Sequence, residues 1–402
     1  MSDLDTSFFC AMQDVLASGP AGLCDTVQAT GVGGVTVAVS YHASVDFRPH
    51  GMQGRIEEFP TGAQYFPTDP ALYADSPVQP WVPEPYAERN LLGELRAETR
   101  RRGMSLTAWT VFGFNERAGR ADPDLCQVNV YGDRYVTDLC PANPGVQRWF
   151  AALAADVVRS GVDWLLAESL HFAPLREGRR FLRLDAAARL AFGLCFCEHC
   201  ERAATGAGVD VHAVRAWARA AADEALAGMA HGPDELSPTE VAAFAGGEVA
   251  GFLRARAAVV RDLVAAVSRV VTAAGGRLLM MDQVAAGPRV LGPTAVHAAL
   301  QYGVDVAAIG SVAPGYAVLG YAPSAALVRA DLDAYREHLP ADAVVRLALR
   351  PSWPDCESAA DLTAKLAAAR SAGVGGVDFY HLGLIPDAAI DRVRAALSEV
   401  TA

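Results

Sequence analysis

Lysine is almost absent from this chain of 402 residues: Lys365 is the only one among 34 lysine and arginine residues. Enzymes that form a Schiff base with a carbonyl substrate need a lysine in the active site. Because we expect Lys365 to lie within a helix and not at the end of a strand, this chemistry has no candidate residue.

Long apolar runs are absent too, and none approaches the roughly 20 residues that cross a membrane. The N-terminal segment carries acidic residues where a secretory signal needs positive charge. We therefore expect a cytoplasmic protein without a membrane partner. Thiols stay reduced in that compartment, so the eight cysteines fit free thiols or metal ligands better than disulfides.

An excess of positive charge is also missing, since the formal net charge is −12. Nucleic acid and anionic membrane surfaces do not attract an acidic protein. No G-x-S-x-G elbow is present, and the GVGG segments at 31–34 and 373–376 are turns entering strands and not a dinucleotide fingerprint. We expect no organic cofactor, and a homo-oligomer is compatible with the sequence.

Eight short and mostly apolar segments have the character of strands buried on both faces, and helix-length segments separate most of them. They predict an α/β protein with a (β/α)8 TIM barrel fold. About 250 residues suffice for such a barrel. We assign the surplus residues to an N-terminal helical extension (1–32) that precedes the barrel (33–402) and to a helical insertion (170–255) after strand four of the barrel. The alternative for the insertion is an elaborated crossover without a function of its own. The predicted strands are residues 35–42, 62–66, 105–112, 162–169, 277–282, 304–310, 344–350 and 376–382.

Two carboxylates follow neighbouring strands where a TIM barrel holds its active site. Glu168 ends the fourth predicted strand, and burial there would raise its pKa toward that of a general acid. Asp282 ends the fifth and is the expected catalytic partner. A structural ion pair is the alternative role for Glu168, and a cap of the next loop is the alternative for Asp282. Asp46, just past the first predicted strand, could also reach the mouth, and ordering its own loop is its alternative role.

Aromatic and hydrogen-bonding side chains near the same strand ends suit a polyhydroxylated ligand, although packing is the alternative role for each aromatic ring. A guanidinium at a barrel mouth is costly to leave unpaired. We therefore expect Arg350 to pair with Glu168 or Asp282, or to bind an anionic group of a substrate. The predicted substrate-binding residues are His42, Trp109, Asn115, Asn129, His171, Arg350, Trp353, Tyr380 and His381, with Tyr41 and Gln283 as further candidates.

Three cysteines stand in the close spacing C-x-C-x2-C: Cys195, Cys197 and Cys200, in LCFCEHC. Such thiolates can converge on one soft cation with tetrahedral preference, and zinc is the common choice. Cys140 is the favoured fourth ligand and His199 the alternative. We predict a structural zinc site; three buried reduced thiols at a helix end are the other interpretation.

The order of Cys140 in CPANP, then Glu168, then the cysteine hook resembles the β-galactosidases of glycoside hydrolase family 42. The resemblance covers roughly residues 105–200. It implies a (β/α)8 barrel in which the four cysteines bind zinc and Glu168 is the general acid/base.

Two positions differ from the pattern of that family. Ala167, and not asparagine, precedes Glu168, and strand seven ends in Leu349-Arg350-Pro351, where the family has its nucleophilic glutamate. The leading hypothesis is a glycoside hydrolase acting on a small-molecule or oligosaccharide ligand. A non-catalytic carbohydrate-binding or regulatory barrel that lacks the nucleophile is the alternative, and a lyase or isomerase using Glu168 and a histidine is a third.

Overall fold

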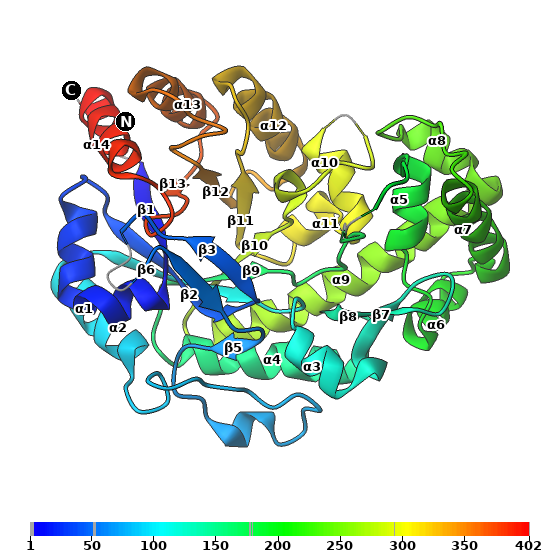
Figure 1. Cartoon of the computed structure of the whole chain (residues 1–402), viewed down its shortest axis with the longest axis horizontal. Helices are drawn as coiled ribbons and strands as arrows, with labels where there is room; N and C mark the ends of the chain where they lie inside the picture. Colours follow the sequence, from blue (N-terminus) through cyan, green and yellow to red (C-terminus); the bar gives the residue numbers. More distant parts are fainter. Residues whose placement is uncertain (1–3, 51–53, 177, 179, 293, 402) are drawn as a thin grey trace.

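Eight parallel strands close into a barrel in the computed structural model, which describes residues 4–50, 54–176, 178, 180–292 and 294–401 (Figure 1). The first strand pairs with both the last and the second, so the sheet has no free edge along these strands. The predicted TIM barrel is confirmed. The barrel strands are β1 (Asp5–Ala11), β2 (Gly34–Tyr41), β6 (Ser105–Val111), β9 (Trp164–Glu168), β10 (Arg277–Met281), β11 (Gly315–Leu319), β12 (Val344–Leu349) and β13 (Gly376–Phe379).

The prediction of an N-terminal helical extension over residues 1–32 is wrong at its start. Asp5–Ala11 forms β1, the strand that closes the barrel, and α1 (Met12–Gln28) follows without an intervening turn. The apolar run Phe8–Met12 is completely buried from both sides. Because no glycine or proline separates strand from helix here, the sequence carries no boundary signal at this point.

Two other predicted strands are also corrected. Residues 62–66 contribute only β5 (Ala63–Gln64), which pairs antiparallel with β2 outside the barrel. Residues 304–310 contain the helix α11 (Val306–Gly310), capped by Asp305, and the sixth strand is β11, which starts five residues later. A short apolar run does not by itself distinguish a strand from a buried helical turn.

Helices surround the barrel, and several neighbours contact one another, among them α1 with α2, α4 with α9, α12 with α13 and α13 with α14. Asn143 caps the helix of residues 144–158, whose first residue is Pro144, a common arrangement at helix starts. The surrounding helices are α1, α2 (Leu91–Arg101), α4 (Pro144–Val158), α9 (Glu248–Ala273), α10 (Ala295–Ala298), α11, α12 (Ala325–His338), α13 (Ala359–Ser371) and α14 (Asp387–Thr401); the short 3-10 turns are η1 (Pro70–Tyr73), η2 (Pro123–Leu125), η3 (Phe244–Gly247), η4 (Val284–Ala286) and η5 (Ala299–Tyr302).

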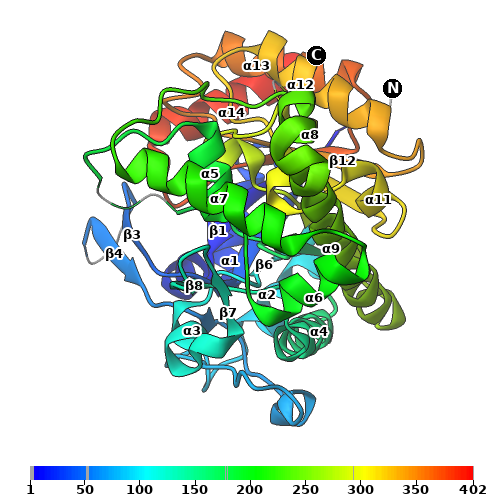
Figure 2. The ribbon, with the colours of Figure 1, turned by 90° about the vertical axis from the view of Figure 1, so that its right-hand side faces the viewer.

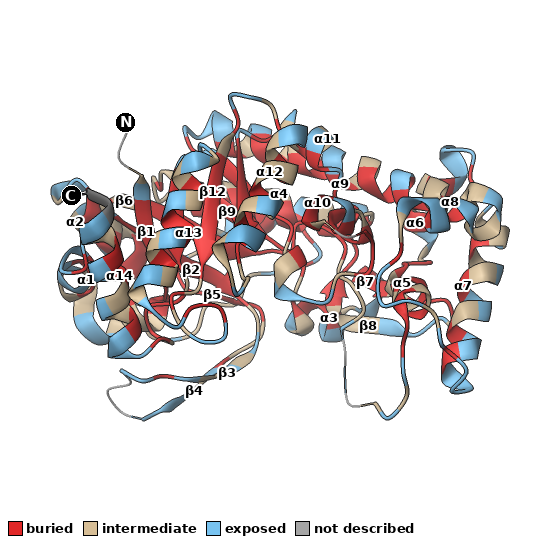
Figure 3. Cartoon of the chain, turned by 90° about the horizontal axis from the view of Figure 1, so that it is seen from above, coloured by how far each residue is buried: buried red, intermediate tan, exposed pale blue. Residues whose placement is uncertain are grey.

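Four further helices lie between β9 and β10 and form one end of the molecule (Figures 2 and 3). They are α5 (Ala186–Gly193), α6 (Glu198–Gly206), α7 (Val211–Leu226) and α8 (Pro238–Ala243). The 26-residue helix α9 contacts α4 and β10 of the barrel as well as α6, α7 and α8. Buried residues of both regions belong to one continuous hydrophobic core, so the four helices are packed on the barrel and not linked to it by a flexible tether.

Two small antiparallel ribbons complete the chain. The first, β3 (Ser44–Phe47) with β4 (Ile56–Phe59), follows β2 at the carboxyl end of the barrel. The second, β7 (Cys126–Val128) with β8 (Arg134–Leu139), follows β6 and the short helix α3 (Glu116–Ala121). Both ribbons therefore extend the end of the barrel where parallel strands present their functional residues. Among the described residues, no helix combines the length and the apolar character of a membrane span.

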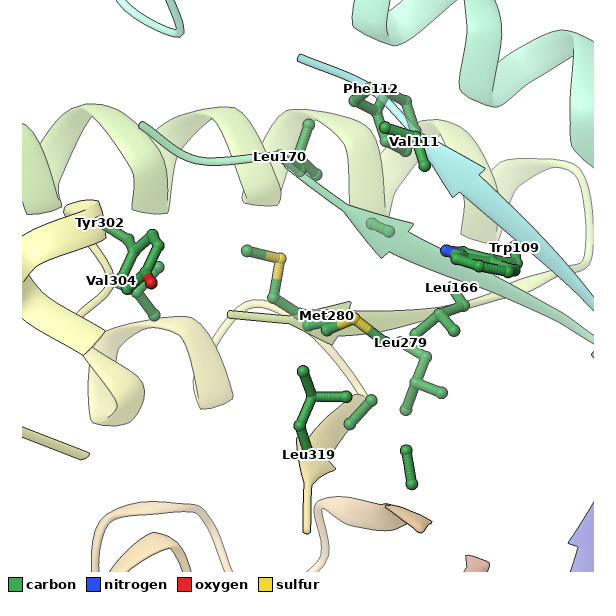
Figure 4. Packing of buried hydrophobic residues seen from close by; sticks show 14 of the residues in the cluster. Trp109, Val111, Phe112, Leu166, Leu170, Leu279, Met280, Tyr302, Val304 and Leu319 are labelled. Carbon is green, nitrogen blue, oxygen red and sulfur yellow. The ribbon is translucent and has the colours of Figure 1, made fainter. Parts of the chain in front are cut away.

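The barrel interior is filled by side chains of successive strands. Trp109 of β6 stands beside Leu166 of β9, which stands beside Leu279 of β10 (Figure 4). Near the amino ends of the strands the filling is polar: Arg346 of β12 donates to both oxygens of Asp378 on β13 at 2.6 and 2.9 Å. Charges this deeply buried need such a partner, because neither can be solvated by water.

We predict that Arg346→Met strongly destabilises the protein. Arg346 is 3% exposed and also donates to Asp5 of β1 at 2.5 Å, so its removal leaves Asp378 buried without a cation. Breaking such a pair typically costs about 3–5 kcal/mol of unfolding free energy, measurable by urea denaturation. The control is Arg329→Met, which removes an exposed pair with Asp333 on α12 and should change stability by less than about 0.5 kcal/mol. Equal effects of the two substitutions would contradict the prediction.

Candidate active site

Glu168 is the last residue of β9, and its side chain points into the mouth of the barrel. It is 7% exposed. The indole Nε1 of Trp109 donates to Oε2 at 2.5 Å, and the amide of Gln283 donates to Oε1 at 2.6 Å. Burial raises the pKa of Glu168 to about 7, although the Trp109 hydrogen bond and the charge of Arg176 oppose this shift. A carboxyl group with this pKa can hold or release a proton near neutral pH.

Gln283, one residue after Asp282, is the group from strand five that reaches Glu168. Its backbone lies in the left-handed region with φ of 61°, a rare conformation for a residue other than glycine. Ser169, also in this region with φ of 55°, donates its hydroxyl to the Gln283 Oε1 at 2.9 Å. This bond fixes the amide orientation, so the Gln283 nitrogen faces Glu168.

Five aromatic rings, among them that of the Glu168 donor Trp109, pack in one cluster, and we call them the aromatic wall: Phe9, Tyr41, Trp109, Tyr321 and Tyr380. The Trp109 ring lies 4.9 Å from Tyr41, 5.2 Å from Phe9 and 5.9 Å from Tyr380, centroid to centroid. Tyr321 lies 5.8 Å from Tyr380. Phe9 and Tyr321 were missed by the sequence analysis because they belong to or follow β1 and β11, the two strands it did not recognise.

His42, predicted to bind substrate, lies at the mouth within a stack of rings. Its ring centroid is 4.2 Å from Tyr41 and 4.5 Å from Phe114, and Arg176 covers the Phe114 ring at 3.6 Å. The His42 Nδ1 bonds to the carbonyl of Ala43 at 2.8 Å. Burial lowers the His42 pKa to about 4, so the ring is neutral at physiological pH. With both faces and one nitrogen engaged, His42 can offer only Nε2 to a ligand.

His171 and His381 are both nearly completely buried, at 2% and 4% exposure. Burial lowers the pKa of His171 to about 4 and that of His381 to about 3. The Nδ1 of His171 bonds to the carbonyl of Phe172, and its Nε2 has no hydrogen-bond partner among the described residues. The Nδ1 of His381 likewise has none in that part of the chain. Each of these two neutral imidazoles thus keeps one nitrogen without a partner among the described residues.

Asp282 does not occupy the place expected for a catalytic partner of Glu168. It is 1% exposed, and its oxygens accept hydrogen bonds from Tyr316 at 2.8 Å, from Tyr335 of the outer helix α12, and from the Val284 amide at 2.9 Å. The alternation along a strand explains this direction. Leu279 points into the barrel, as do Leu166 and Glu168. Side chains alternate along a strand, so Asp282, three residues after Leu279, points outward.

Arg350 and Trp353 also differ from expectation. Arg350 pairs with Asp355 at 2.5 Å and lies over the Tyr321 ring at 4.0 Å, so its ionic partner is neither Glu168 nor Asp282. Trp353 is 79% exposed in the loop after β12, where it could meet only a ligand that extends out of the barrel.

Asn115 and Asn129, both predicted to bind substrate, have local structural roles. Asn115 caps α3 by accepting from the Ala118 amide at 3.0 Å, and Asn129 orders the β7–β8 turn by accepting from the amides of Tyr131 and Asp133. Asparagine competes for backbone donors in this way at helix starts and turns. These amide oxygens are therefore committed to the protein's own backbone.

Asp46 lies on the inner face of the β3–β4 ribbon. Residues of this ribbon alternate between exposed and half-buried, and Phe59 on the inner face of β4 packs on Tyr41 at 5.7 Å. The pKa values of Tyr41 and Tyr380 are raised mainly by burial and also by the charges of both Glu168 and Asp46. The two tyrosines therefore lie near both carboxyl groups.

Four cysteines converge outside the mouth, as the sequence analysis expected. Cys140 follows β8, Cys195 and Cys197 lie between α5 and α6, and Cys200 is in the first turn of α6. The Cys140 sulfur is 3.5, 3.6 and 3.9 Å from those of Cys200, Cys197 and Cys195. In a tetrahedral centre with metal–sulfur bonds of about 2.3 Å the sulfurs stand about 3.8 Å apart. The arrangement can therefore hold a metal ion.

No family model and no curated protein matches this chain. Among solved structures, α-L-fucosidase isoenzyme 2 from Paenibacillus thiaminolyticus superposes with a TM-score of 0.51 at 13% identity, over 94% of this chain and 45% of the fucosidase chain. This chain thus spans less than half the length of that fucosidase.

Two chitinases have lower scores. The chitinase from Chromobacterium violaceum has a TM-score of 0.43 at 12% identity, over 98% of this chain and 99% of its own. The class V chitinase from Pseudomonas fluorescens has 0.46 at 8% identity, over 98% and 100%. The three neighbours are glycoside hydrolases, and at these identities the likeness to the fucosidase concerns the fold alone.

Proposed function

We propose that the protein is a glycoside hydrolase in which Glu168 is the general acid/base. The observation that carries the proposal is a buried carboxyl group at the end of barrel strand four, with a pKa of about 7 and two fixed hydrogen-bond donors. Glycosidic cleavage needs a proton on the departing oxygen. A carboxyl group that remains protonated near neutral pH can supply it. The fucosidase that shares the fold is a glycoside hydrolase too.

The surroundings of Glu168 support a saccharide as ligand. The aromatic wall offers flat apolar faces, which pack against sugar C–H groups. The free nitrogens of His171 and His381 offer hydrogen bonds to hydroxyl groups. A small number of convergent polar groups in an apolar setting is the usual composition of a small-molecule site.

Asp46 is our candidate for the second carboxylate of the reaction, in place of Asp282. It is half-buried on the inner face of the β3–β4 ribbon, and burial raises its pKa. Its charge acts on Tyr41 and Tyr380, as does that of Glu168. A pair of carboxyl groups on either side of a sugar is what both retaining and inverting glycosidases use.

A non-catalytic carbohydrate-binding barrel is the second candidate function. The observation that favours it is the end of strand seven, where Arg350 is paired with Asp355 and no carboxylate takes the place of a nucleophile. In this case the aromatic wall would bind sugar, and Glu168 would be a hydrogen-bonding residue without a catalytic partner.

The four cysteines are proposed to hold a structural zinc ion, as the resemblance to the family 42 β-galactosidases implies. The sulfur spacing fits a tetrahedral ion, and a closed set of four thiolates leaves no position for a substrate. Residues 126–139 and α6 meet at this centre: the Val128 amide donates to the Cys195 sulfur at 3.3 Å. None of the eight cysteines forms a disulfide.

Replacing Glu168 by glutamine should abolish turnover of aryl glycosides. A panel covering several sugars, with wild type and Glu168→Gln side by side, tests this by release of the aryl group. We expect kcat to fall at least 100-fold, since general acid–base catalysis contributes about 10²–10⁴. Wild-type kcat/KM should fall as pH rises above about 7, because Glu168 then loses its proton. Sugar binding without any turnover in the wild type would support the binding barrel.

The same assay distinguishes Asp46 from Asp282 as the catalytic partner of Glu168. Asp46→Asn should lower kcat by a similar factor while leaving the unfolding midpoint nearly unchanged. Asp282→Asn should keep the specific activity of the folded protein but lower its stability, since three donors lose their charged acceptor. The opposite pattern would restore Asp282 as the catalytic residue.

Glu168→Gln should also stabilise the protein at alkaline pH relative to wild type. The folded pKa of about 7 lies above the ordinary value, so the stability contributed by protonated Glu168 is complete below about pH 4.5 and is lost as pH rises through 7. Glutamine cannot ionise. The difference in unfolding free energy between variant and wild type should therefore grow by about 2–3 kcal/mol from pH 5 to pH 8, measured by urea denaturation. A constant difference would contradict a raised pKa.

Protein purified without added metal should contain about one equivalent of zinc, by elemental analysis. Chelation should lower the melting temperature, because structural zinc binding is worth on the order of 10 kcal/mol in folding. Cys200→Ser should lose the metal, whereas Cys356→Ser, at a buried thiol elsewhere, should retain it. Less than a tenth of an equivalent in the wild type would rule out the zinc proposal.

A further inference from the structure

Arg256 is a buried cation without an evident counter-charge. It belongs to α9 and is 3% exposed. None of its three guanidinium nitrogens has a hydrogen-bond partner among the described residues, and the guanidinium lies over the ring of Phe172, at 4.3 Å from the centroid. An isolated buried charge costs several kcal/mol. A ring face compensates only part of that cost.

The cysteine hook lies on the side of α9 that carries Arg256. Burial lowers the pKa of Arg256. The packing agrees: Phe252, one turn before Arg256 on α9, contacts the ring of Phe196 at 5.6 Å, and Phe196 stands between Cys195 and Cys197. This face of α9 is therefore directed toward the cysteine hook.

Metal binding by the four cysteines decides whether the charge of Arg256 is compensated. Four neutral thiols would leave the guanidinium alone in an apolar interior. Four thiolates with one divalent ion carry a net charge of −2, which a single guanidinium reduces to −1. A buried arginine and a four-thiolate metal centre thus each provide the opposite charge that the other requires.

We infer that Arg256 is the buried counter-ion of a four-thiolate metal centre and, through Phe172, couples that centre to the segment that follows Glu168. The inference rests on the proposed metal site. Phe172 lies against Arg256, its amide donates to the Tyr302 carbonyl at 3.1 Å, and its own carbonyl bonds to His171. Residues 169–172 thereby connect the guanidinium to the mouth of the barrel.

The experiment compares Arg256→Met with Arg254→Met, an exposed position on the same helix. Zinc affinity is measured by competition with a chromophoric chelator on the full chain. We expect Arg256→Met to weaken zinc binding about 10–100-fold, the range seen for residues that support metal ligands. Arg254→Met should leave the affinity within about twofold, and Arg256→Lys, which keeps the charge, should recover part of the loss.

Stability with and without metal separates a counter-ion from a packing residue. In the zinc-loaded protein Arg256→Met should lower the melting temperature, and after chelation it should raise it, because the wild-type guanidinium is then unpaired. The same change in both states would overturn the inference and make Arg256 a packing residue. A wild type that binds no zinc would instead refute the metal proposal itself, so the two failures are distinguishable.

Discussion

The closure of the barrel by β1 is the constraint on which the rest of the structure depends. This strand pairs with β13 on one side and β2 on the other, and Arg346 joins it to β13 through Asp5 and Asp378. Closure fixes the register of the neighbouring strands, so that Phe9 at the end of β1 lies against both Trp109 and Tyr380. Without this strand the aromatic wall beside Glu168 would be open.

The candidate active site combines two opposing electrostatic effects. Burial disfavours the ionised form of Glu168, whereas the donors Trp109 and Gln283 and the nearby cation Arg176 favour it. The balance leaves the carboxyl group close to half-ionised at neutral pH, the condition in which it can exchange a proton in both directions. Burial shifts the pKa values of His171 and His381 in the opposite direction, downward, because desolvation favours the neutral imidazole.

The helices between β9 and β10 are joined to this site by packing and not by sequence proximity. Helix α9 belongs to the barrel wall and also contacts α6, α7 and α8. Arg256 and Phe252 on this helix bring the cysteine centre and the segment after Glu168 into one buried region. The helices between β9 and β10 are thus packed next to the segment that follows Glu168 and are more than an addition to the surface.

The sequence by itself determined the fold class, the position of Glu168 at a strand end, and the convergence of Cys140 with Cys195, Cys197 and Cys200. The fold class, the place of Glu168 and the hook of Cys195, Cys197 and Cys200 follow from apolar runs and close spacing, which are local properties, whereas the four-cysteine set with Cys140 is what the resemblance to the family 42 β-galactosidases implies. Only the tertiary structure decided that β1 is a strand, that Gln283 reaches Glu168 while Asp282 turns outward to Tyr316 and Tyr335, and that Arg350 pairs with Asp355. The direction of a side chain beyond a strand end depends on strand parity and loop geometry, and its partners come from distant elements. No local pattern in the sequence records these contacts.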